Sequence, residues 1–369
     1  MLFLVNGIRL FNMKVVIYTQ YLESGGAEKR ASVYANYLFK QGVDVSLITM
    51  HRTEKEYYVE KGIPRYFVSE SLDDYLKLSK KQRLAGLKKH LLDIQPDIVI
   101  SFLPTFSFYA TLAVKFDKRL KHIKLVHSVT LYQRKYSFFE RCVDFMCCLY
   151  ADKISLQCQE QLKCNKLFKK KCIVSFNPIH DSWNDNIDRQ YDNLSIISVG
   201  RMTKQKNFEI AINAVAKAHS SNENISLDIF GEGPTKEKLI ALVNKLNASD
   251  YIKILPFSYN LKEEFSKHNV YLSTSRFEGF PNALVEAMMS GLVCLSTPCP
   301  TGPKEIIDDS VNGFLCKDAE ELSSKLLELS KDKIACKDIG KQARKKAKEC
   351  FEDSVVLPKY LKEISKIIK

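Results

Sequence analysis

The sequence feature that most constrains the fold is a strand–turn–helix pattern that occurs twice in succession between Tyr271 and Leu315. An apolar run at Val270–Ser273 leads into the turn EGFP and then into an amphipathic helical pattern that Gly291 ends. A second apolar run and a second proline-rich turn repeat the order, with a helix expected from Lys304. Proline favours the first helical turn, and glycine the position just after a helix. The alternation predicts an α/β fold, in which ligands bind at the carboxyl ends of the strands.

Two carboxylates flank the first of these turns. Glu278 precedes the helix and Glu286 lies inside it, with seven residues between them. Because helical side chains lean toward the helix N-terminus, Glu286 can point toward the turn. We also expect three unpaired amides at the helix start, which would attract phosphate, at Asn282, Ala283 and Leu284. A nucleotide sugar carries both phosphate and hydroxyl groups, although an ordinary helix with two solvated glutamates fits the spacing as well.

The segment SRFEGFPNALVEAM resembles the E-x7-E signature of the retaining glycosyltransferases of family GT4. The following STPCPTGPKEI and NGFL are also similar to segments of that family. The resemblance implies the GT-B fold, an α/β architecture of two Rossmann-like doubly wound domains that face each other across a cleft. It further implies a UDP-sugar as the donor substrate, with no other cofactor. Since the sequence has no D-x-D motif, we expect no metal.

A pair of cations follows another expected strand. Gly200-Arg201 ends that strand, and Lys206 precedes Asn207, which we expect to cap the next helix with its side chain. Arginine binds phosphate bidentately and lysine binds it as a point charge, so the pair suits a diphosphate. Bare surface charge would give the same pattern. The element is similar to the G-R-x4-K-N element of the family, and this resemblance implies that Arg201 and Lys206 neutralise the nucleotide diphosphate as the sugar bond breaks.

The resemblance assigns roles to three further residues of the C-terminal half. It implies that Glu278 accepts hydrogen bonds from hydroxyls of the donor sugar, and that Glu286 holds the ribose hydroxyls. Phe257 ends an expected strand, IKILPF, whose following backbone usually holds the uracil ring in the family. Many relatives have glycine where Pro256 stands, so the sequence departs from the family pattern at this point.

Two positions in the N-terminal half are predicted to contribute to the same site. Gly26 belongs to a glycine pair between the first strand and its helix, where backbone can approach a ligand closely. His127 closes another expected strand in LVHSV. A plain turn and a structural histidine are the alternatives. The resemblance places the Gly-Gly loop near the donor phosphate and the acceptor, and the histidine toward the donor sugar, which would make His127 catalytic together with Glu278, Arg201 and Lys206.

The length of 369 residues leaves room for two domains. We predict an acceptor-binding domain at residues 1–176, a nucleotide-sugar-binding domain at 177–353, and a terminal helix at 354–369 that crosses back to the first domain. The polar run Asp181–Asn193 is interpreted as the linker, because it has few apolar residues to bury. Either Met1 or Met13 fits as the start, since the first strand pattern begins at Lys14.

The chain is basic, with a formal net charge of +13. Residues 115–171 contain fourteen Lys/Arg against five Asp/Glu, interleaved with aromatic residues that include Tyr132 and Tyr136. A basic helix expected over Tyr75–Leu92 adds to this charge. Such surfaces suit nucleic acid or an anionic membrane, and the sequence contains no nucleic-acid-binding motif. We therefore expect contact with a membrane that carries the acceptor, and no nucleic acid as a partner.

The cysteines and the N-terminus bear on localisation. Eleven cysteines without a C-x-x-C pair, and no segment apolar enough to span a bilayer, indicate a reducing cytosol. The hydrophobic segment 1–11 carries Arg9 and lacks a small-residue cleavage site, so we do not interpret it as a signal peptide. The expected location is the cytoplasm, peripheral at the inner face of the membrane.

Together these observations predict a retaining, metal-independent hexosyltransferase. It would move a hexose or N-acetylhexosamine, with N-acetylgalactosamine, galactose or N-acetylglucosamine favoured, from a UDP-sugar to a glycan acceptor. The acceptor is expected to be linked to polyprenyl diphosphate, in the assembly of a bacterial capsule, O-antigen, lipopolysaccharide or related surface polysaccharide. A sugar-nucleotide epimerase with the GT-B fold and a non-enzymatic nucleic-acid binder are the alternatives.

Overall fold

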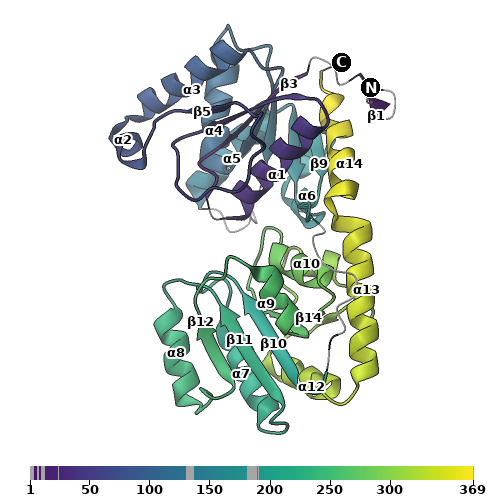
Figure 1. Ribbon diagram of the computed structural model, residues 1–369. Coiled ribbons are helices and arrows are strands. Elements are labelled where there is room, and N and C mark those ends of the chain that lie inside the picture. The colour runs from purple at the N-terminus through teal and green to yellow at the C-terminus, as the bar shows by residue number, and fades with distance from the viewer. Residues whose placement is uncertain are drawn as a thin grey trace. The chain divides into compact units, whose positions relative to one another are not determined.

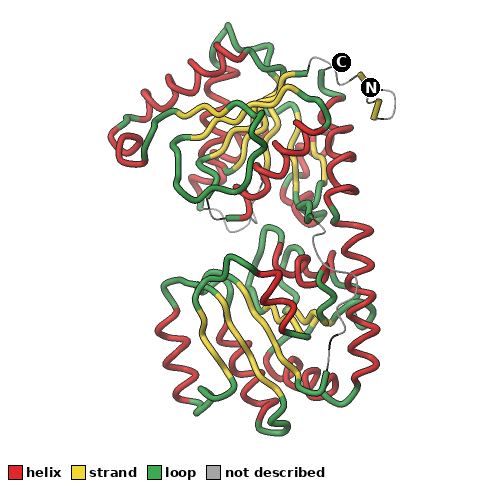
Figure 2. The backbone as a smooth tube through the Cα atoms, in the orientation of Figure 1, coloured by secondary structure: helices red, strands yellow, loops and turns green. Residues whose placement is uncertain are grey.

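The computed structural model describes residues 4–5, 8–9, 13–23, 25–129, 137–180, 189 and 191–368. The chain divides into two compact units. Unit 1 comprises residues 1–178 and 354–369, and unit 2 comprises residues 179–353. Each unit is a parallel sheet with helices on both of its faces (Figures 1 and 2). The predicted linker 181–193 and the aromatic residues Tyr132 and Tyr136 fall largely or wholly outside the described residues.

Unit 1 contains a seven-stranded sheet in the order β5-β4-β3-β6-β7-β8-β9. Every neighbouring pair in it is parallel. Its strands are short apolar runs, as expected for a sheet buried on both faces. Their bounds are β3 (Lys14–Thr19), β4 (Asp44–Thr49), β5 (Arg65–Phe67), β6 (Ile98–Phe102), β7 (Lys124–Ser128), β8 (Lys153–Leu156) and β9 (Cys172–Val174). The strand order reverses direction between β3 and β6, which is the topological switch point of a doubly wound sheet.

The helices of unit 1 cover both faces of this sheet. They are α1 (Gly26–Lys40), α2 (Leu72–Lys77), α3 (Lys80–Ile94), α4 (Pro104–Lys115), α5 (Phe138–Tyr150), α6 (Glu160–Cys164), the 3-10 helix η2 (Lys166–Lys171) and α14 (Asp353–Ser365). The buried side of α14 belongs to the same hydrophobic core as α1, and the rings of Tyr34 and Tyr360 lie 4.5 Å apart. Figure 1 shows α14 beside α1 and β9. The last helix of the chain therefore completes the core of unit 1.

The single basic helix predicted over Tyr75–Leu92 is wrong, because two helices occupy this region. A new helix, α3, begins after Ser79. The Ser79 side chain accepts a hydrogen bond from the Gln82 amide, and the Gln82 side chain accepts one from the Ser79 amide. Such a capping box satisfies two backbone amides at the N-terminus of a helix, so it shows that a separate helix starts here.

Unit 2 repeats the architecture with a six-stranded sheet in the order β12-β11-β10-β13-β14-β15. Its strands are β10 (Leu194–Val199), β11 (Ile225–Phe230), β12 (Ile252–Leu255), β13 (Val270–Ser273), β14 (Val293–Ser296) and β15 (Phe314–Leu315). Its helices are α7 (Phe208–His219), α8 (Lys236–Lys245), α9 (Leu261–Lys267), α10 (Asn282–Met289), α11 (Pro303–Ile306), α12 (Ala319–Leu329) and α13 (Lys333–Phe351). The direction in which successive strands are added to the sheet again reverses between β10 and β13. Both sheets are therefore doubly wound, as predicted. A short antiparallel pair, β1 (Leu4–Val5) and β2 (Ile8–Arg9), stands apart from both sheets.

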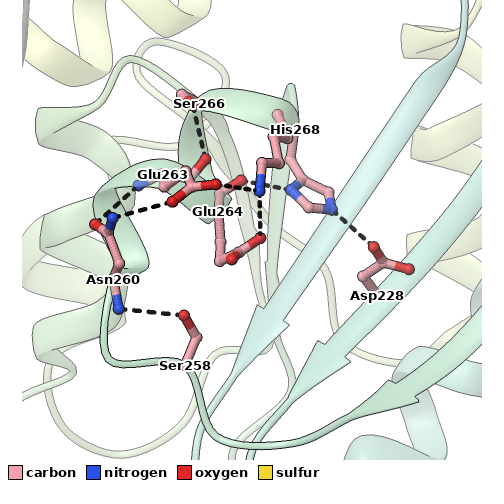
Figure 3. Close-up of polar contacts among 8 residues, drawn as sticks. Asp228, Ser258, Asn260, Glu263, Glu264, Ser266 and His268 are labelled. Atoms are coloured by element: carbon pink, nitrogen blue, oxygen red, sulfur yellow. Dashed lines mark hydrogen bonds and ion pairs between the residues drawn. The ribbon is translucent and has the colours of Figure 1, made fainter.

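The short helix α9 is fixed at both ends by polar contacts (Figure 3). At its start, the Asn260 side chain accepts a hydrogen bond from the Glu263 amide. Just after its end, the ring of His268 lies 2.6 Å from the Glu264 carbonyl oxygen through Nδ1 and 3.3 Å from Asp228 Oδ2 through Nε2. Asp228 belongs to β11, so these contacts tie the end of α9 to the sheet immediately before β13 begins.

A buried arginine holds α9 and α10 together. The Arg189 guanidinium donates to the carbonyl oxygen of Phe265 at 2.8 Å, to that of Ser290 at 2.7 Å, and to that of His268. These carbonyls lie at the C-terminal ends of α9 and α10, where helices leave acceptors unpaired. Burial lowers the pKa of Arg189 to about 10. Arg189 therefore caps the helix that carries Glu286.

No helix in the described part of the chain combines the length and the apolar composition needed to cross a bilayer.

Candidate active site

The site of unit 2 lies at the switch point of its sheet. The loop 200–207 follows β10 and the loop 274–281 follows β13, so both leave the carboxyl ends of adjacent strands. Several hydrogen bonds fasten the loops to each other. The Arg276 amide donates to the Gln205 carbonyl at 2.8 Å, the Gln205 side chain donates to the Phe277 carbonyl at 2.9 Å, and the Thr274 hydroxyl donates to the Lys206 carbonyl at 3.1 Å. The two loops therefore form one platform.

Lys206 and Glu278 form an ion pair on this platform. Lys206 Nζ lies 2.7 Å from Glu278 Oε1. The Glu278 side chain is only 8% exposed and also accepts a hydrogen bond from the Ser275 hydroxyl at 2.5 Å. The Thr301 hydroxyl donates to the Glu278 carbonyl oxygen. A buried carboxylate needs such partners, since an unpaired buried charge is strongly destabilising.

Two glycines allow the close approach of chain segments around this pair. Gly200 has a φ of 152°, and a Cβ at this position would lie 2.9 Å from Cε of Lys206. Gly302 has a φ of 91°, and its Cβ would lie 2.3 Å from Cδ of Pro281. Both positions combine a left-handed φ with no space for a side chain, which only glycine tolerates well.

Arg201 directly follows Gly200 and is exposed. Among the residues that the structure describes, it has no ion-pair or hydrogen-bond partner for its guanidinium. Lys206 has three N–H donors, and within the described residues its side chain bonds only to Glu278. Both cations therefore retain donors that could bind an anionic ligand at the carboxyl end of β10.

Asn207 differs in detail from its prediction. It is the residue before α7, but its side chain makes no hydrogen bond to the start of the helix. Its Oδ1 instead accepts a hydrogen bond from Nη2 of Arg276 at 3.1 Å. The side chain is thus used to join the two loops of the platform, and its backbone takes up a left-handed conformation with a φ of 54°.

Glu286 lies on the buried side of α10. Burial raises the pKa of Tyr271 well above its ordinary value, and the nearby charges of Glu278 and Glu286 raise it further. Both carboxylates are therefore near the same phenol ring on β13. With seven residues between them, the two carboxylates lie on either side of the start of α10, and both are close to Tyr271.

The prediction of three unpaired amides at the start of α10 is wrong for two of them. The Asn282 amide donates to the Phe280 carbonyl at 3.0 Å, and the Leu284 amide donates to the Pro281 carbonyl at 3.0 Å. The reason is that α10 begins at Asn282 and the turn before it folds back on the helix start. The amide of Ala283 takes part in neither of these bonds. The start of α10 therefore has fewer amides available for a phosphate than expected.

Phe257 follows β12 at the same edge of the sheet, two strands away from β10. Its ring is half-exposed and lies 4.9 Å from that of Tyr259, at an interplanar angle of 81°. The two aromatic rings thus provide an accessible apolar surface after β12, of the kind that a nucleobase can contact.

In unit 1, Gly26 begins α1 in the loop after β3, at the switch point of that sheet. The preceding Gly25 has a φ of 123°, and its amide donates to the Tyr57 hydroxyl at 3.2 Å. Gly26 itself is exposed, so its backbone is open to a ligand.

His127 lies near the carboxyl end of β7 and is buried, with 3% of its side chain exposed. Its Nε2 is 3.0 Å from Asp144 Oδ1 on α5. Cys148, one turn further along α5, has its Sγ 4.0 Å from Asp144 Oδ2. Sequence reasoning missed Asp144. The available signal was an acidic residue within an otherwise apolar helical face that includes Val143, Cys147 and Cys148.

His127, Asp144 and Cys148 also have the geometry of a possible metal site. One potential ligand atom from each lies within 4.8 Å of the others. Burial raises the pKa of the Cys148 thiol well above its ordinary value, and the charge of Asp144 raises it further. The 3.0 Å contact of Nε2 with Oδ1 and the 4.0 Å contact of Sγ with Oδ2 are those of a hydrogen-bonded cluster.

The structure thus brings Lys206 and Glu278 into contact, and it places Arg201 and Phe257 in loops and Ala283 and Glu286 in a helix that follow strands of unit 2. Gly26 and His127 lie at the carboxyl edge of the unit 1 sheet.

Two doubly wound Rossmann-like units, each with polar residues at the carboxyl edge of its sheet, define the class of GT-B proteins. A solved structure of Anabaena Alr3699/HepE in complex with UDP and glucose shares the fold with a TM-score of 0.79. The match covers 96% of this chain and 100% of that one at 16% sequence identity. At this identity the likeness shows the fold alone.

The sequence models of two protein families match consecutive parts of the chain. Residues 24–154 match Glycosyltransferase Family 4, and residues 181–346 match Glycosyl transferases group 1. Together they span most of the sequence and correspond to the two units. The chain belongs to the GT4 glycosyltransferases.

Two relatives of known activity are similar over much of their length. A Campylobacter jejuni enzyme is 27% identical over 96% of this chain and 99% of its own. It is an alpha-1,4-N-acetyl-D-galactosaminyltransferase that acts on GalNAc-alpha-(1->4)-GalNAc-alpha-(1->3)-diNAcBac-PP-undecaprenol. The lipopolysaccharide 1,6-galactosyltransferase of Escherichia coli is 28% identical over 64% of this chain and 66% of its own. These relatives favour a glycosyltransferase over an epimerase or a nucleic-acid binder.

Proposed function

We propose that the protein is a retaining, metal-independent glycosyltransferase that moves an N-acetylhexosamine or hexose from a UDP-sugar to a lipid-linked glycan. The observation that carries this proposal is the Lys206–Glu278 ion pair at the switch point, together with Arg201 of the same loop, whose guanidinium has no partner among the residues described. The C. jejuni relative acts on a glycan linked to undecaprenyl diphosphate, which supports that class of acceptor in bacterial surface glycan assembly. N-acetylgalactosamine is our first choice of sugar, followed by galactose, after the two relatives; N-acetylglucosamine is third.

The cations would act on the diphosphate. When the bond from the sugar to UDP breaks, negative charge develops on the leaving phosphate. Arg201 and Lys206 would stabilise this charge, and removing one preorganised donor of this kind costs about 3 kcal/mol in the transition state. Lys206 is held by Glu278 before any donor binds, so its ammonium needs little reorganisation. Because these side chains supply the positive charge, the scheme requires no metal ion.

The carboxylates would act on the hydroxyls. Glu278 would accept hydrogen bonds from the donor sugar, and Glu286 from the ribose. The bond between the anomeric carbon and the diphosphate oxygen breaks, and the acceptor hydroxyl oxygen bonds to the same carbon from the same face. The hydroxyl proton passes to the leaving phosphate oxygen, so UDP is released and the anomeric configuration is retained. This route needs no covalent nucleophile from the protein.

A surface on unit 1 supports contact with a membrane. We define the α5–η2 surface by three apolar and three basic side chains: Phe138, Phe139, Leu167, Lys166, Lys169 and Lys170. The three apolar side chains are 84%, 74% and 86% exposed. The rings of Phe145 and Phe168, 5.4 Å apart, join α5 to η2. Exposed apolar side chains beside lysines suit the interface of an anionic bilayer, where a lipid-linked acceptor would be held.

The experiment that tests the function is a screen for UDP release. Purified protein is incubated with UDP-N-acetylgalactosamine, UDP-galactose and UDP-N-acetylglucosamine, each with a polyprenyl-diphosphate-linked glycan and with EDTA. We expect acceptor-dependent UDP release from one donor, and retention in the product by NMR. Lys206→Ala should lower kcat/KM about 100-fold, whereas Lys204→Ala, an exposed lysine of the same loop, should not.

Two results would contradict the proposal. One is the absence of UDP release with every donor and acceptor. The other is conversion of the UDP-sugar to its epimer without any acceptor, which would instead indicate the epimerase.

A further inference from the structure

The Nδ1 atom of His127 is buried and has no hydrogen-bond partner among the described residues. Buried polar atoms are nearly always hydrogen-bonded, so an exception requires an explanation. The residue lies near the carboxyl end of β7, at the edge of the sheet where doubly wound proteins bind their ligands. A ligand atom is the partner that this position suggests.

The other nitrogen of the ring is fixed by Asp144. Nε2 lies 3.0 Å from Asp144 Oδ1, and both side chains are buried. A carboxylate only accepts hydrogen bonds, so Nε2 must carry the proton. In the neutral ring the second nitrogen then has a free lone pair and acts as an acceptor. The contact with Asp144 therefore determines what His127 can offer at Nδ1.

We propose that Asp144 is a positioning residue, which holds His127 as the Nε2–H tautomer so that Nδ1 accepts a hydrogen bond from a hydroxyl of a sugar substrate bound at the carboxyl edge of the unit 1 sheet. The identity of the ligand rests on the proposed function, whereas the tautomer does not. Asp144 touches no substrate in this account and acts only through the imidazole. It thereby adds a residue to the site that the motifs of the chain do not reveal.

Cys148 supports the hydrogen-bonded arrangement. Its Sγ lies 4.0 Å from Asp144 Oδ2 and 3.6 Å from Asn165 Oδ1, both of which are acceptors. A thiol can donate to one of these oxygens, whereas a thiolate could donate to neither. Asn165 Oδ1 is the nearer of the two acceptors, and Asp144 keeps its Oδ1 contact with His127 whichever oxygen the thiol donates to.

The tautomer can be measured without turnover. In protein labelled with 15N-histidine, two-bond spectra report which ring nitrogen is protonated, and His127→Gln identifies the signals of His127. We expect Nε2–H in the wild type, a changed tautomer population in Asp144→Asn, and the wild-type pattern in Cys148→Ser. Nδ1–H in the wild type, or an unchanged pattern in Asp144→Asn, would overturn the proposal. So would a zinc-induced shift of these signals that Cys148→Ser abolishes, because it would indicate a metal site.

Measurements of kcat then test whether the tautomer of His127 matters for the transfer reaction. Asp144→Asn should lower kcat about tenfold, the equivalent of one misdirected hydrogen bond, while its affinity for UDP stays unchanged because the diphosphate site lies in unit 2. Cys148→Ser should retain wild-type kcat, and circular dichroism of both variants checks that they fold. A changed tautomer with unchanged kcat would overturn the positioning role. If the wild type releases no UDP from any UDP-sugar, the proposed function fails, yet the NMR result still decides whether Asp144 fixes the ring.

Discussion

At the scale of single residues, the ion pair between Lys206 and Glu278 is the feature on which the site depends. The motifs identified both residues separately, but they did not predict that one would hold the other. The two residues are 72 positions apart, and only the pairing of β10 with β13 brings their loops together. Sequence patterns describe local structure well, whereas contacts between distant loops follow from the order of the strands in the sheet. Asp144 was missed because its contact with His127 depends on how α5 packs against β7.

The first prediction concerns the strength of this pair. In a double-mutant cycle of Lys206→Met and Glu278→Gln, we expect a coupling free energy of about 1–3 kcal/mol, because the pair is largely buried and in direct contact. Urea unfolding of the wild type, the two single variants and the double variant measures it. Lys204→Met combined with Glu278→Gln is the matched control and should be additive. A coupling no larger than that of the control would show that the pair does not form.

The second prediction concerns Asp152, which precedes β8. Burial alone would raise its pKa, but the Leu125 amide and the Lys115 ammonium, each 2.9 Å from Oδ2, lower the pKa below its ordinary value. A carboxyl whose pKa is lower in the folded protein stabilises the fold above its unfolded pKa, and this contribution is lost as the pH falls. Asp152→Asn should therefore cost about 2 kcal/mol of unfolding free energy at pH 7.

The cost of Asp152→Asn should shrink as the pH falls below about 4, where the carboxyl of the unfolded protein becomes protonated, and should be lost below the lowered pKa of the folded protein. Unfolding by urea at several pH values measures the difference between the two proteins. Asp73→Asn, an exposed position, serves as the control. A difference that stays constant with pH would contradict the assigned contacts of Asp152.

At the scale of helices and strands, the alternation of short apolar runs with amphipathic segments was enough to predict two parallel α/β sheets. It succeeded because strands buried on both faces carry a strong and continuous apolar signal. It failed over Tyr75–Leu92, where local capping by Ser79 outweighs a continuous basic pattern. It also could not reveal Arg189, which joins α9 and α10 through carbonyls more than 70 positions away in the sequence.

The third prediction follows from this buried arginine. Arg189→Met should lower the unfolding free energy by about 3 kcal/mol, because it leaves the carbonyls at the ends of two helices without donors. Lys331→Met, at an exposed position, should have little effect. Chemical denaturation compares the two variants with the wild type. If Arg189→Met is as stable as Lys331→Met, the guanidinium does not cap α9 and α10.

At the scale of the whole molecule, we propose that the chain combines a nucleotide-binding site on unit 2 with a basic, aromatic surface on unit 1. The sequence predicted the charge of this surface from composition alone. It did not show that Phe138, Phe139 and Leu167 are exposed, since exposure depends on how α5 and η2 pack. The acceptor and the membrane are therefore linked, in our proposal, through one surface of unit 1.

The fourth prediction tests that surface. Vesicles of phosphatidylcholine with about a third phosphatidylglycerol should sediment the protein, whereas pure phosphatidylcholine vesicles should bind it weakly. Replacing Phe138 and Phe139 by Ser, or Lys169 and Lys170 by Gln, should weaken this binding, and high salt should weaken it as well. The exposed Lys262 and Lys331 of unit 2, replaced by Gln, provide a charge-matched control. Equal binding by all variants would contradict the assignment of the α5–η2 surface.

The central claim is that the switch point of unit 2 holds a nucleotide diphosphate with side-chain cations. Calorimetric titration of the full-length protein with UDP in the presence of EDTA tests it most directly. We predict that UDP binds without metal, that Arg201→Ala and Lys206→Ala each weaken its affinity about tenfold or more, and that Lys204→Ala binds as the wild type does. Affinity that depends on added Mg²⁺, or that survives both substitutions unchanged, would contradict the claim.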